Sequence, residues 1–292
     1  MTARFRVTVP ASTANLGPGF DTFGMALALY DLVEVEVTDA GLAVEVVDAG
    51  AGSVDEVPTD ETHLVVKALR RTCEHLGVRP DGLRLRCHNR IPHARGLGSS
   101  AAAVVSGVAA GYALAGAEPD SAALQLAAEF EGHADNAAAS LFGGFVLAWC
   151  TGGAFRAERL VPHPSIRPVL AVPRERSATA VTRGLLPAKV PHADAAFTAG
   201  RAALAVHAMT SRPELLLEAT EDRLHQDYRA SAYPASAALV GELRQHGVAA
   251  AISGAGPSVL ALTTGGVLPA EVAADGFEVV GIPVDLGGVR VE

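Results

Sequence analysis

Cysteine, basic stretches and long apolar runs are all scarce in this sequence, and each scarcity excludes a class of protein. The three cysteines, Cys73, Cys87 and Cys150, are scattered and form no Cys-x-x-Cys pair or metal-type spacing, so a reduced, cytoplasmic protein is expected. The formal net charge is −9 and no Lys/Arg-rich run occurs, which argues against a nucleic-acid partner. No apolar run approaches membrane-spanning length and residues 1–10 hold no continuous apolar signal, so neither a membrane partner nor secretion is expected.

The chain is long enough for two domains. It has 292 residues, of which 49% are hydrophobic and 19% charged, which is typical of an ordered globular protein. Predicted strands and helices interleave in both halves, and this pattern favours an α+β fold over a helix bundle or a sandwich. A glycine pair and two nearby prolines mark the expected boundary, so we predict domains at 1–155 and 156–292.

Local patterns predict most of the regular elements. Residues 32–37 and 42–47 alternate strictly around Asp39-Ala40-Gly41, which indicates a hairpin. A helix over 64–76 is expected to be capped by Thr59 or Asp60 and to end at Gly77. Further strands are expected at 83–87, 145–149, 167–172, 248–252, 258–262, 277–283 and 287–291, and further helices at 101–114, 120–131, from 135, 194–209, 213–225 and 235–246.

The segment Pro10–Asp21 is the most informative stretch of the chain. It follows the alternating run Phe5–Val9, which predicts a strand, and it reads PASTANLGPGFD. Glycines, a hydroxyl pair, an amide and a carboxylate lie so close together that we predict a loop able to curl around a small ligand. On this segment alone, an ordinary connecting loop is the alternative.

A second candidate loop, Gly96-Leu97-Gly98-Ser99-Ser100, lies between a predicted strand and a helix. Glycines let backbone amides approach an anion, and the N-terminus of a helix adds a partial positive charge. Ser99 and Ser100 are also candidate caps of the helix. The Gly-Lys-Ser/Thr ending of a Walker A loop and the third glycine of a dinucleotide fingerprint are both missing. The loop therefore predicts a phosphate site of another kind, and the alternative is a plain capped helix.

These two segments and Ser253-Gly254-Ala255-Gly256-Pro257-Ser258, taken in order, resemble the three signature motifs of the GHMP small-molecule kinases. Within that superfamily, the spelling of the first segment is similar to that of homoserine kinases. The resemblance runs through essentially the whole chain and includes residues 129–136 and Leu141-Phe142-Gly143-Gly144. Four ordered matches are far more specific than one glycine loop.

The resemblance implies a two-domain α+β fold with the active site between the domains. The N-terminal domain would contain a left-handed β-α-β unit, and the C-terminal domain would be ferredoxin-like. It also implies Mg²⁺- and ATP-dependent phosphorylation of the hydroxyl of L-homoserine, a step of threonine biosynthesis. The resemblance leaves open whether the protein forms a homodimer.

The resemblance assigns roles around the nucleotide. Ser100 and Glu129 would be the Mg²⁺ ligands, with Glu131 as the rival of Glu129, because the family varies in this spacing. A hard cation held by few protein oxygens suits this pair. The ATP phosphates would lie against Pro92, Arg95, Gly96, Leu97, Gly98, Ser99, Ser100, Ala101 and Ala102.

The resemblance also assigns the amino-acid substrate. Asp21 would hold its ammonium group, and the arginines would hold its carboxylate with forked donors. The implied substrate-binding residues are Asn15, Asp21, His133, Asn136, Arg183 and Arg229. The implied catalytic residues are Asn15, Asn136, Thr179 and Arg183.

The sequence departs from the family pattern in two places. The family's usual proline before Tyr228 is absent, which weakens the assignment of Arg229, and Ala137–Ala139 replace a usual valine and proline. Some relatives carry an aspartate base where this chain has Asn136, so we expect no protein base and a reaction that depends on positioning and charge.

Two alternative functions stay open at this point. One is a kinase of the same superfamily acting on another small alcohol, and the other is an ATP-binding regulatory protein without catalysis. Taken singly, each candidate residue also has a structural explanation: Asn15 and Asn136 as turn or cap residues, Glu129 and Glu131 as a solvated helix face, and His133 as a core histidine.

Overall fold

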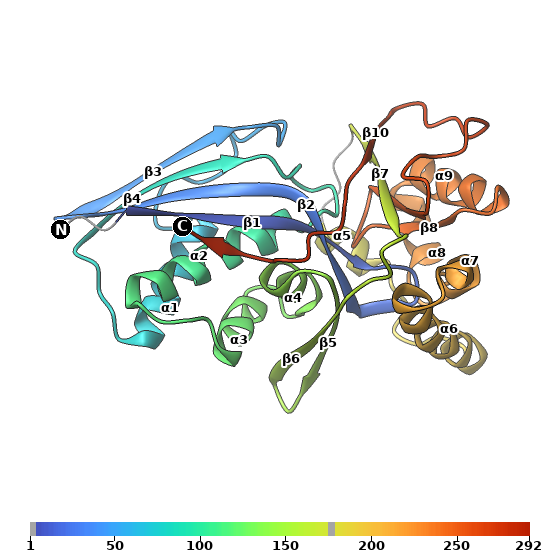
Figure 1. Cartoon of the computed structure of the whole chain (residues 1–292), viewed down its shortest axis with the longest axis horizontal. Helices are drawn as coiled ribbons and strands as arrows, with labels where there is room; N and C mark the ends of the chain where they lie inside the picture. Colours follow the sequence, from blue (N-terminus) through green and yellow to red (C-terminus); the bar gives the residue numbers. More distant parts are fainter. Residues whose placement is uncertain (1–3, 175–178) are drawn as a thin grey trace.

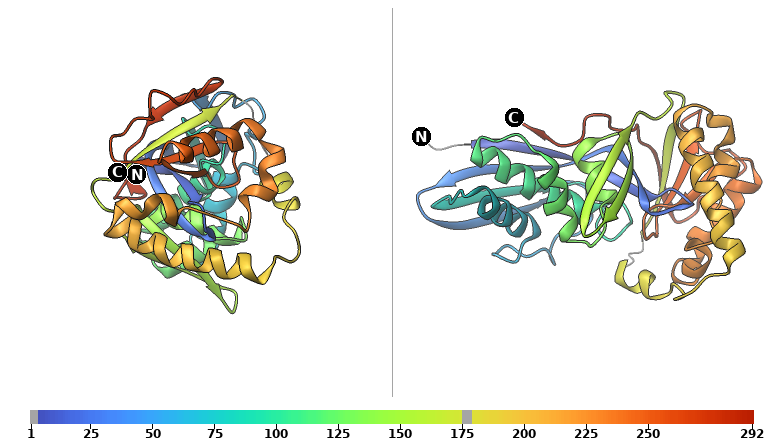
Figure 2. Two further views of the ribbon diagram at one scale, coloured as in Figure 1. Left: turned by 90° about the vertical axis from the view of Figure 1, so that its right-hand side faces the viewer. Right: turned by 90° about the horizontal axis from the view of Figure 1, so that it is seen from below.

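The computed structural model describes residues 4–174 and 179–292, and it describes the side chains of this range except at residues 179–181. Two sheets, each covered by helices, lie side by side in an elongated molecule (Figure 1). Figure 2 shows that the N-terminal strands and the helices of the second half occupy opposite ends. The predicted α+β fold is confirmed. No helix in the described ranges is both long and apolar enough to cross a membrane.

The first sheet follows the order β11-β1-β2-β4-β3, and the hairpin of β5 and β6 joins it through β2. The long strand β2 pairs with β4 through residues 32–38 and with β5 through residues 23–25, so one strand serves two parts of the sheet. The strands are β1 (Arg4–Asn15), β2 (Gly19–Thr38), β3 (Gly41–Asp48), β4 (Gly82–Asn89), β5 (Phe145–Thr151), β6 (Ala154–Leu160) and β11 (Arg290–Val291).

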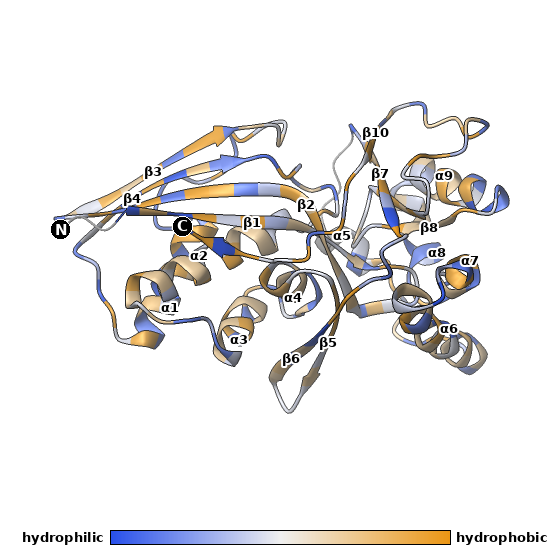
Figure 3. Ribbon diagram, in the orientation of Figure 1, coloured by the Kyte–Doolittle hydropathy of each residue, from blue (hydrophilic) through white to orange (hydrophobic). Residues whose placement is uncertain are grey.

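The expected hairpin around Asp39–Gly41 is wrong. Strand β3 does not pair with β2; it lies parallel to β4, which is inserted between them, and α1 makes the crossover. Strands β2 and β3 both alternate between hydrophilic and hydrophobic residues (Figure 3). This local pattern fits a hairpin as well as it fits two strands that do not pair with each other. Parallel neighbours need such a crossover connection.

Helices cover one face of the first sheet (Figure 1). The predicted helix over 64–76 is confirmed and ends at Gly77 in the left-handed conformation, but its cap is His63 rather than Thr59 or Asp60. Asp60 instead accepts from Thr62 in the preceding turn. The helices are α1 (Leu64–Leu76), α2 (Ser99–Ala115), α3 (Ser121–Glu129) and α4 (Asp135–Phe142).

The second sheet follows the order β10-β7-β9-β8 and is antiparallel throughout. Its strands are β7 (Arg167–Pro173), β8 (Ala249–Ile252), β9 (Val259–Thr263) and β10 (Phe277–Gly281). The helical elements of this half are α5 (Thr179–Gly184), α6 (His192–Thr210), η1 (Pro213–Leu215), α7 (Leu216–Ala219), α8 (Gln226–Arg229), η2 (Ala230–Ala232) and α9 (Pro234–Gln245). The helix expected over 213–225 is therefore two short pieces that end at Ala219.

The chain crosses between the sheets twice. Strand β6 still pairs with β5 in the first sheet, and the C-terminal β11 returns to pair with β1. The division at 155/156 stays a prediction, and the pairing of β6 favours a division after Leu160.

The segment Pro10–Asp21 is a strand and a turn rather than the predicted loop. Strand β1 continues to Asn15 with register shifts after Pro10 and Ala14, and β2 begins at Gly19. Asn15, Leu16 and Gly17 have positive φ values of 69°, 47° and 89°, so the chain reverses within a few residues. A Cβ atom on Gly17 would lie 2.3 Å from the carbonyl oxygen of Thr220, so only glycine lets this turn pack there.

Candidate active site

Two cavities meet at the N-terminus of α2. The central cavity has a volume of about 480 Å³ and lies between the two halves, and the side cavity has about 380 Å³ and lies against α1 and β4. Ala94, Ser99 and Ser100 line both. A ligand bound in one cavity can therefore reach the other across the first turn of α2.

Glycines shape the wall that the cavities share. Gly98 is the N-cap of α2 in the left-handed conformation, with φ of 68° and no side-chain cap, so the predicted serine caps are wrong. A Cβ atom on Gly98 would lie 2.0 Å from the Oγ of Ser12, and one on Gly96 would lie 2.2 Å from the carbonyl oxygen of Ser253. The first N–H groups of a helix have no partners within it, so this end of α2 can bind an anion.

The three motifs hold one another by hydrogen bonds. The backbone N–H of Ser12 donates to the carbonyl of Leu97 (3.1 Å), and the hydroxyl of Ser253 donates to the carbonyl of Gly96 (2.7 Å). The Ser12 hydroxyl also donates to Asn136 Oδ1 (3.0 Å). The glycine loop is thus fixed from both sides before any ligand binds.

Seven of the nine residues predicted around the phosphates line one cavity, and their role in binding phosphate stays a prediction. The central cavity is lined by Pro92, Arg95, Gly96, Leu97, Gly98, Ser99 and Ser100, whereas Ala101 and Ala102 are buried in α2 and line neither cavity. Arg95 crosses between the halves, since its Nε donates to the carbonyl of Pro173 in β7 (2.8 Å).

Asn15 is a buried connector in the central cavity. Its side-chain nitrogen donates to the carbonyl of Gly254 (2.8 Å), and its oxygen accepts from the backbone N–H of Asp21 (3.0 Å). Asn15 is 4% exposed. These bonds fix Asp21, which has a φ of 53°, at the wall of the cavity.

Asp21 and Arg183 satisfy each other. Two guanidinium nitrogens of Arg183 donate to the two carboxylate oxygens of Asp21, each at 2.9 Å. The hydrogen bonds that Arg183 donates to the Asp21 carboxylate raise the pKa of Arg183 above its usual value. Strand β2 and helix α5 thereby meet across the cavity.

Arg229 is a buried cation facing the same cavity. It is 1% exposed, and burial lowers its pKa. Its Nε donates to the carbonyl of Thr182 (3.2 Å) and its Nη1 lies 3.4 Å from His225 Nδ1, but no carboxylate among the described residues pairs with it. The ring of Phe20 lies under both guanidiniums, 5.2 Å from Arg229 and 5.5 Å from Arg183. A buried cation of this kind fits an anionic ligand group.

The two candidate glutamates occupy different surroundings. Glu131 lines the central cavity, its Oε2 is buried without a partner, and burial raises its pKa while the nearby His133 and Ser100 oppose that rise. Glu129 is exposed at the end of α3, where it accepts from Gln125 (2.9 Å), outside both cavities. The structure therefore does not bring Glu129 to the site, and Glu131 replaces it as the candidate ligand because it lines the cavity and its Oε2 has no hydrogen-bond partner.

His133 and Asn136 are joined through Asp135. The Nδ1 of His133 lies 2.8 Å from Asp135 Oδ1, which also accepts from the backbone N–H of Asn136 (2.7 Å). The hydrogen bond with Asp135, which is 2% exposed, raises the pKa of His133. Thr179 begins α5, but its side chain lies outside the described residues.

Sequence reasoning missed several residues of the site. Phe20, Asp135 and His225 position other site residues, and no periodic pattern distinguishes them. The polar lining of the side cavity was also missed: Asp31, His63, Asn89 and His93. Phe20 and Asp135 lie within the matched motifs at residues 10–21 and 129–136, and His225 precedes residues 226–229; these positions were the available signal.

This two-sheet fold, with three motifs closed around a glycine loop at a helix N-terminus, defines a kinase of the GHMP class. Residues 63–144 match the family GHMP kinases N terminal domain, and residues 201–275 match the family GHMP kinases C terminal.

The proteins most useful for comparison within this class are homoserine kinases. The chain is 52% identical to the homoserine kinase of Streptomyces avermitilis, covering 99% of this chain and 96% of that one. It is 57% identical to the homoserine kinase of Streptomyces coelicolor, over 89% and 84% of the two chains. A crystal structure of homoserine kinase from Cytophaga hutchinsonii superposes with a TM-score of 0.86 at 26% identity, covering 99% and 97%. The chain belongs to the homoserine kinase family.

Proposed function

We propose that this chain transfers the terminal phosphoryl group of ATP to the side-chain hydroxyl of L-homoserine, with Mg²⁺, in the cytoplasm. The observation that carries the proposal is the pair of cavities joined at Ser99 and Ser100, one of which presents a carboxylate and a buried cation together. A zwitterionic amino acid needs both charges.

The nucleotide would lie across the shared wall. Its nucleoside would occupy the side cavity, and its phosphates would lie over the glycine loop, where N–H groups and the helix dipole favour negative charge. Because the protein carries a net charge of −9, this local device has to oppose the overall field.

Mg²⁺ would bind Glu131 and Ser100. The unpartnered Oε2 of Glu131 is an orphaned buried acceptor at the cavity wall, and a hydroxyl beside a carboxylate is a donor set that a hard cation accepts. When bound, the metal would neutralise charge on the transferring phosphoryl group.

The amino acid would occupy the central cavity. Its carboxylate would bind Arg229 and draw Arg183 away from Asp21, and the freed Asp21 carboxylate would accept the substrate ammonium. This exchange replaces one ion pair by two, with both guanidiniums sharing the single carboxylate of the substrate. Two forked donors then fix the orientation of the substrate.

The hydroxyl would react through positioning. Asn136 cannot accept a proton, so the proton would pass to the phosphate or to water as the phosphoryl group moves. His133, held by Asp135, lies at the same wall and would orient the substrate.

A substrate without a carboxylate tests this proposal. We expect 3-amino-1-propanol to be phosphorylated at least about 30-fold less efficiently than L-homoserine, since a charged contact is worth about 2–5 kcal/mol when one partner is removed. Arg229→Lys should raise the KM for homoserine and leave the KM for ATP nearly unchanged. Equal turnover of the two substrates by the wild type would refute the proposal.

A further inference from the structure

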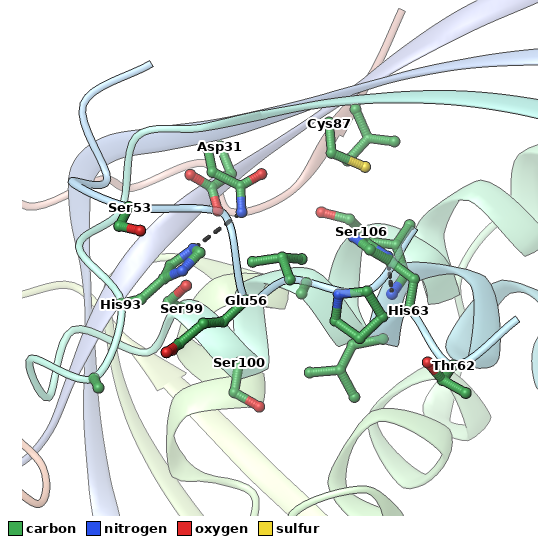
Figure 4. A pocket seen from close by; sticks show the side chains of 18 residues that line it. Asp31, Ser53, Glu56, Thr62, His63, Cys87, His93, Ser99, Ser100 and Ser106 are labelled. Carbon is green, nitrogen blue, oxygen red and sulfur yellow. Dashed lines mark hydrogen bonds between the residues drawn. The ribbon is translucent and has the colours of Figure 1, made fainter. Parts of the chain in front are cut away.

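His63 carries an unused hydrogen-bond donor in the side cavity. It caps α1, where its Nδ1 accepts from the backbone N–H of Val65 (3.2 Å). Because Nδ1 accepts this bond, the proton of the neutral ring lies on Nε2, and burial lowers the pKa of His63, which favours the neutral form. That Nε2 is buried without a partner, His63 is 3% exposed, and its ring faces the cavity (Figure 4). A buried donor left unpaired is costly, which points to a ligand acceptor.

Asp31 carries an unused acceptor in the same cavity. It lies on β2 and is 5% exposed, and its Oδ1 accepts from the backbone N–H groups of Arg90 (2.7 Å) and Ile91 (2.8 Å). Its other oxygen, Oδ2, has no partner among the described residues. The carboxylate group is thus fixed in place with one oxygen left for a ligand.

We infer that His63 and Asp31 read the edge of the nucleobase, with His63 Nε2–H donating to a ring nitrogen and Asp31 Oδ2 accepting from the 6-amino group of adenine. The inference rests on the proposed function, which puts the nucleoside in this cavity. Guanine would offer a carboxylate two N–H donors for a bidentate contact. Since Oδ1 is already committed to two backbone amides, a single remaining oxygen fits the single amino group of adenine better.

Two substitutions remove these contacts with little other change. Asn is a good helix cap, so His63→Asn keeps an acceptor for Val65 and deletes only the Nε2 donor. Asp31→Asn keeps an oxygen for the two backbone amides and turns the free acceptor into a donor. The matched control is Asp60→Asn, which alters the turn before α1 at a residue that lines neither cavity.

Calorimetric titration of each purified protein with Mg-ADP and with Mg-IDP tests the inference without requiring turnover. The wild type should bind ADP about tenfold or more tightly than IDP, because the 6-oxo group of IDP meets Asp31 as an acceptor. His63→Asn should weaken ADP binding about tenfold, Asp31→Asn should reverse the preference towards IDP, and Asp60→Asn should match the wild type.

Wild-type affinity and preference in both cavity variants would overturn the inference and leave a buried water as the partner of His63. Tighter binding of GDP than of ADP by the wild type would overturn it as well. If Asp31→Asn does not fold, the ADP affinity of His63→Asn and the preference of the wild type for ADP over IDP still test the inference. A wild type that binds ADP selectively but does not phosphorylate homoserine would refute the proposed function and still support the recognition of adenine by His63 and Asp31.

Discussion

At the scale of single residues, Glu131 and Glu129 provide a matched pair. Glu131→Gln should lower kcat by orders of magnitude, because a metal ligand stabilises the charge of the phosphoryl group most strongly during transfer. Glu129→Gln should stay near the wild type, since this carboxylate is exposed and contacts Gln125. Steady-state kinetics over a range of Mg²⁺ concentrations would measure both. The opposite result would restore Glu129 as the ligand.

Asp31 should make stability depend on pH. Burial raises its pKa from 3.8 to about 6, so the folded protein holds this proton more tightly than the unfolded chain. Its contribution to stability is complete below pH 3.8 and is lost as the pH rises through 6, a loss of roughly 3 kcal/mol.

Asp31→Asn removes that titration. The variant should gain stability relative to the wild type between about pH 4 and pH 7, in proportion to this loss. Urea unfolding of both proteins at several pH values would measure the difference. A difference that stays constant across this range would contradict the shifted pKa.

At the scale of elements, helix α2 allows a comparison of its two ends. Gly98 at the start and Gly116 after the end both have positive φ, 68° and 63°. A Cβ atom would clash with Ser12 at Gly98 and would meet nothing within 4 Å at Gly116. Gly116→Ala should therefore cost only about 1 kcal/mol of stability and leave nucleotide binding intact.

Gly98→Ala should cost more stability and weaken ADP binding, because Ser12 or the glycine loop has to shift. Thermal unfolding and ADP titration of both variants would check this. Equal effects of the two substitutions would show that the shape of the glycine loop is not what binds the phosphates.

The sequence predicted a helix or strand well where a single nearby residue determines where that element begins or ends. Helix α1 ends at Gly77 as expected, because a glycine in the left-handed conformation stops a helix. Long-range pairing was not predictable: β4 inserts between β2 and β3, and no alternation of residues reveals which neighbour a strand takes. The loop expected at 10–21 became a strand because pairing with β2 continues through a proline and two register shifts.

The candidate site was predicted in part. The motifs identified Asp21, Arg183 and Arg229, which the structure brings to one cavity. Spacing alone could not separate Glu129 from Glu131, because the choice depends on where α3 ends. The side-cavity residues come from β2, β4, the loops before α1 and after β4, and the first turns of α1 and α2, and only the folded chain brings them together.

At the scale of the whole molecule, the C-terminal return ties the chain to the first sheet. Asp285 is 5% exposed and accepts from Gly287 and Gly288 (3.0 and 2.6 Å), from the Tyr30 hydroxyl (2.8 Å) and from Arg290 (3.2 Å). Asp285→Ala should lower the free energy of unfolding by about 2–4 kcal/mol, because these donors lose a buried charged acceptor.

Denaturant unfolding would measure this loss, with Glu278→Ala on the exposed strand β10 as the control. A loss no larger than that of the control would show that the C-terminal segment contributes little to the first sheet.

The central claim is that this chain is a kinase whose cavity selects the zwitterionic amino acid homoserine. The most direct test is a coupled ADP-release assay with Mg-ATP and four substrates: L-homoserine, mevalonate, galactose and L-threonine. We expect strong turnover of L-homoserine to O-phospho-L-homoserine, little of L-threonine, and none of the two substrates that lack an amino-acid head. Strong activity on mevalonate or galactose with none on homoserine would contradict the account.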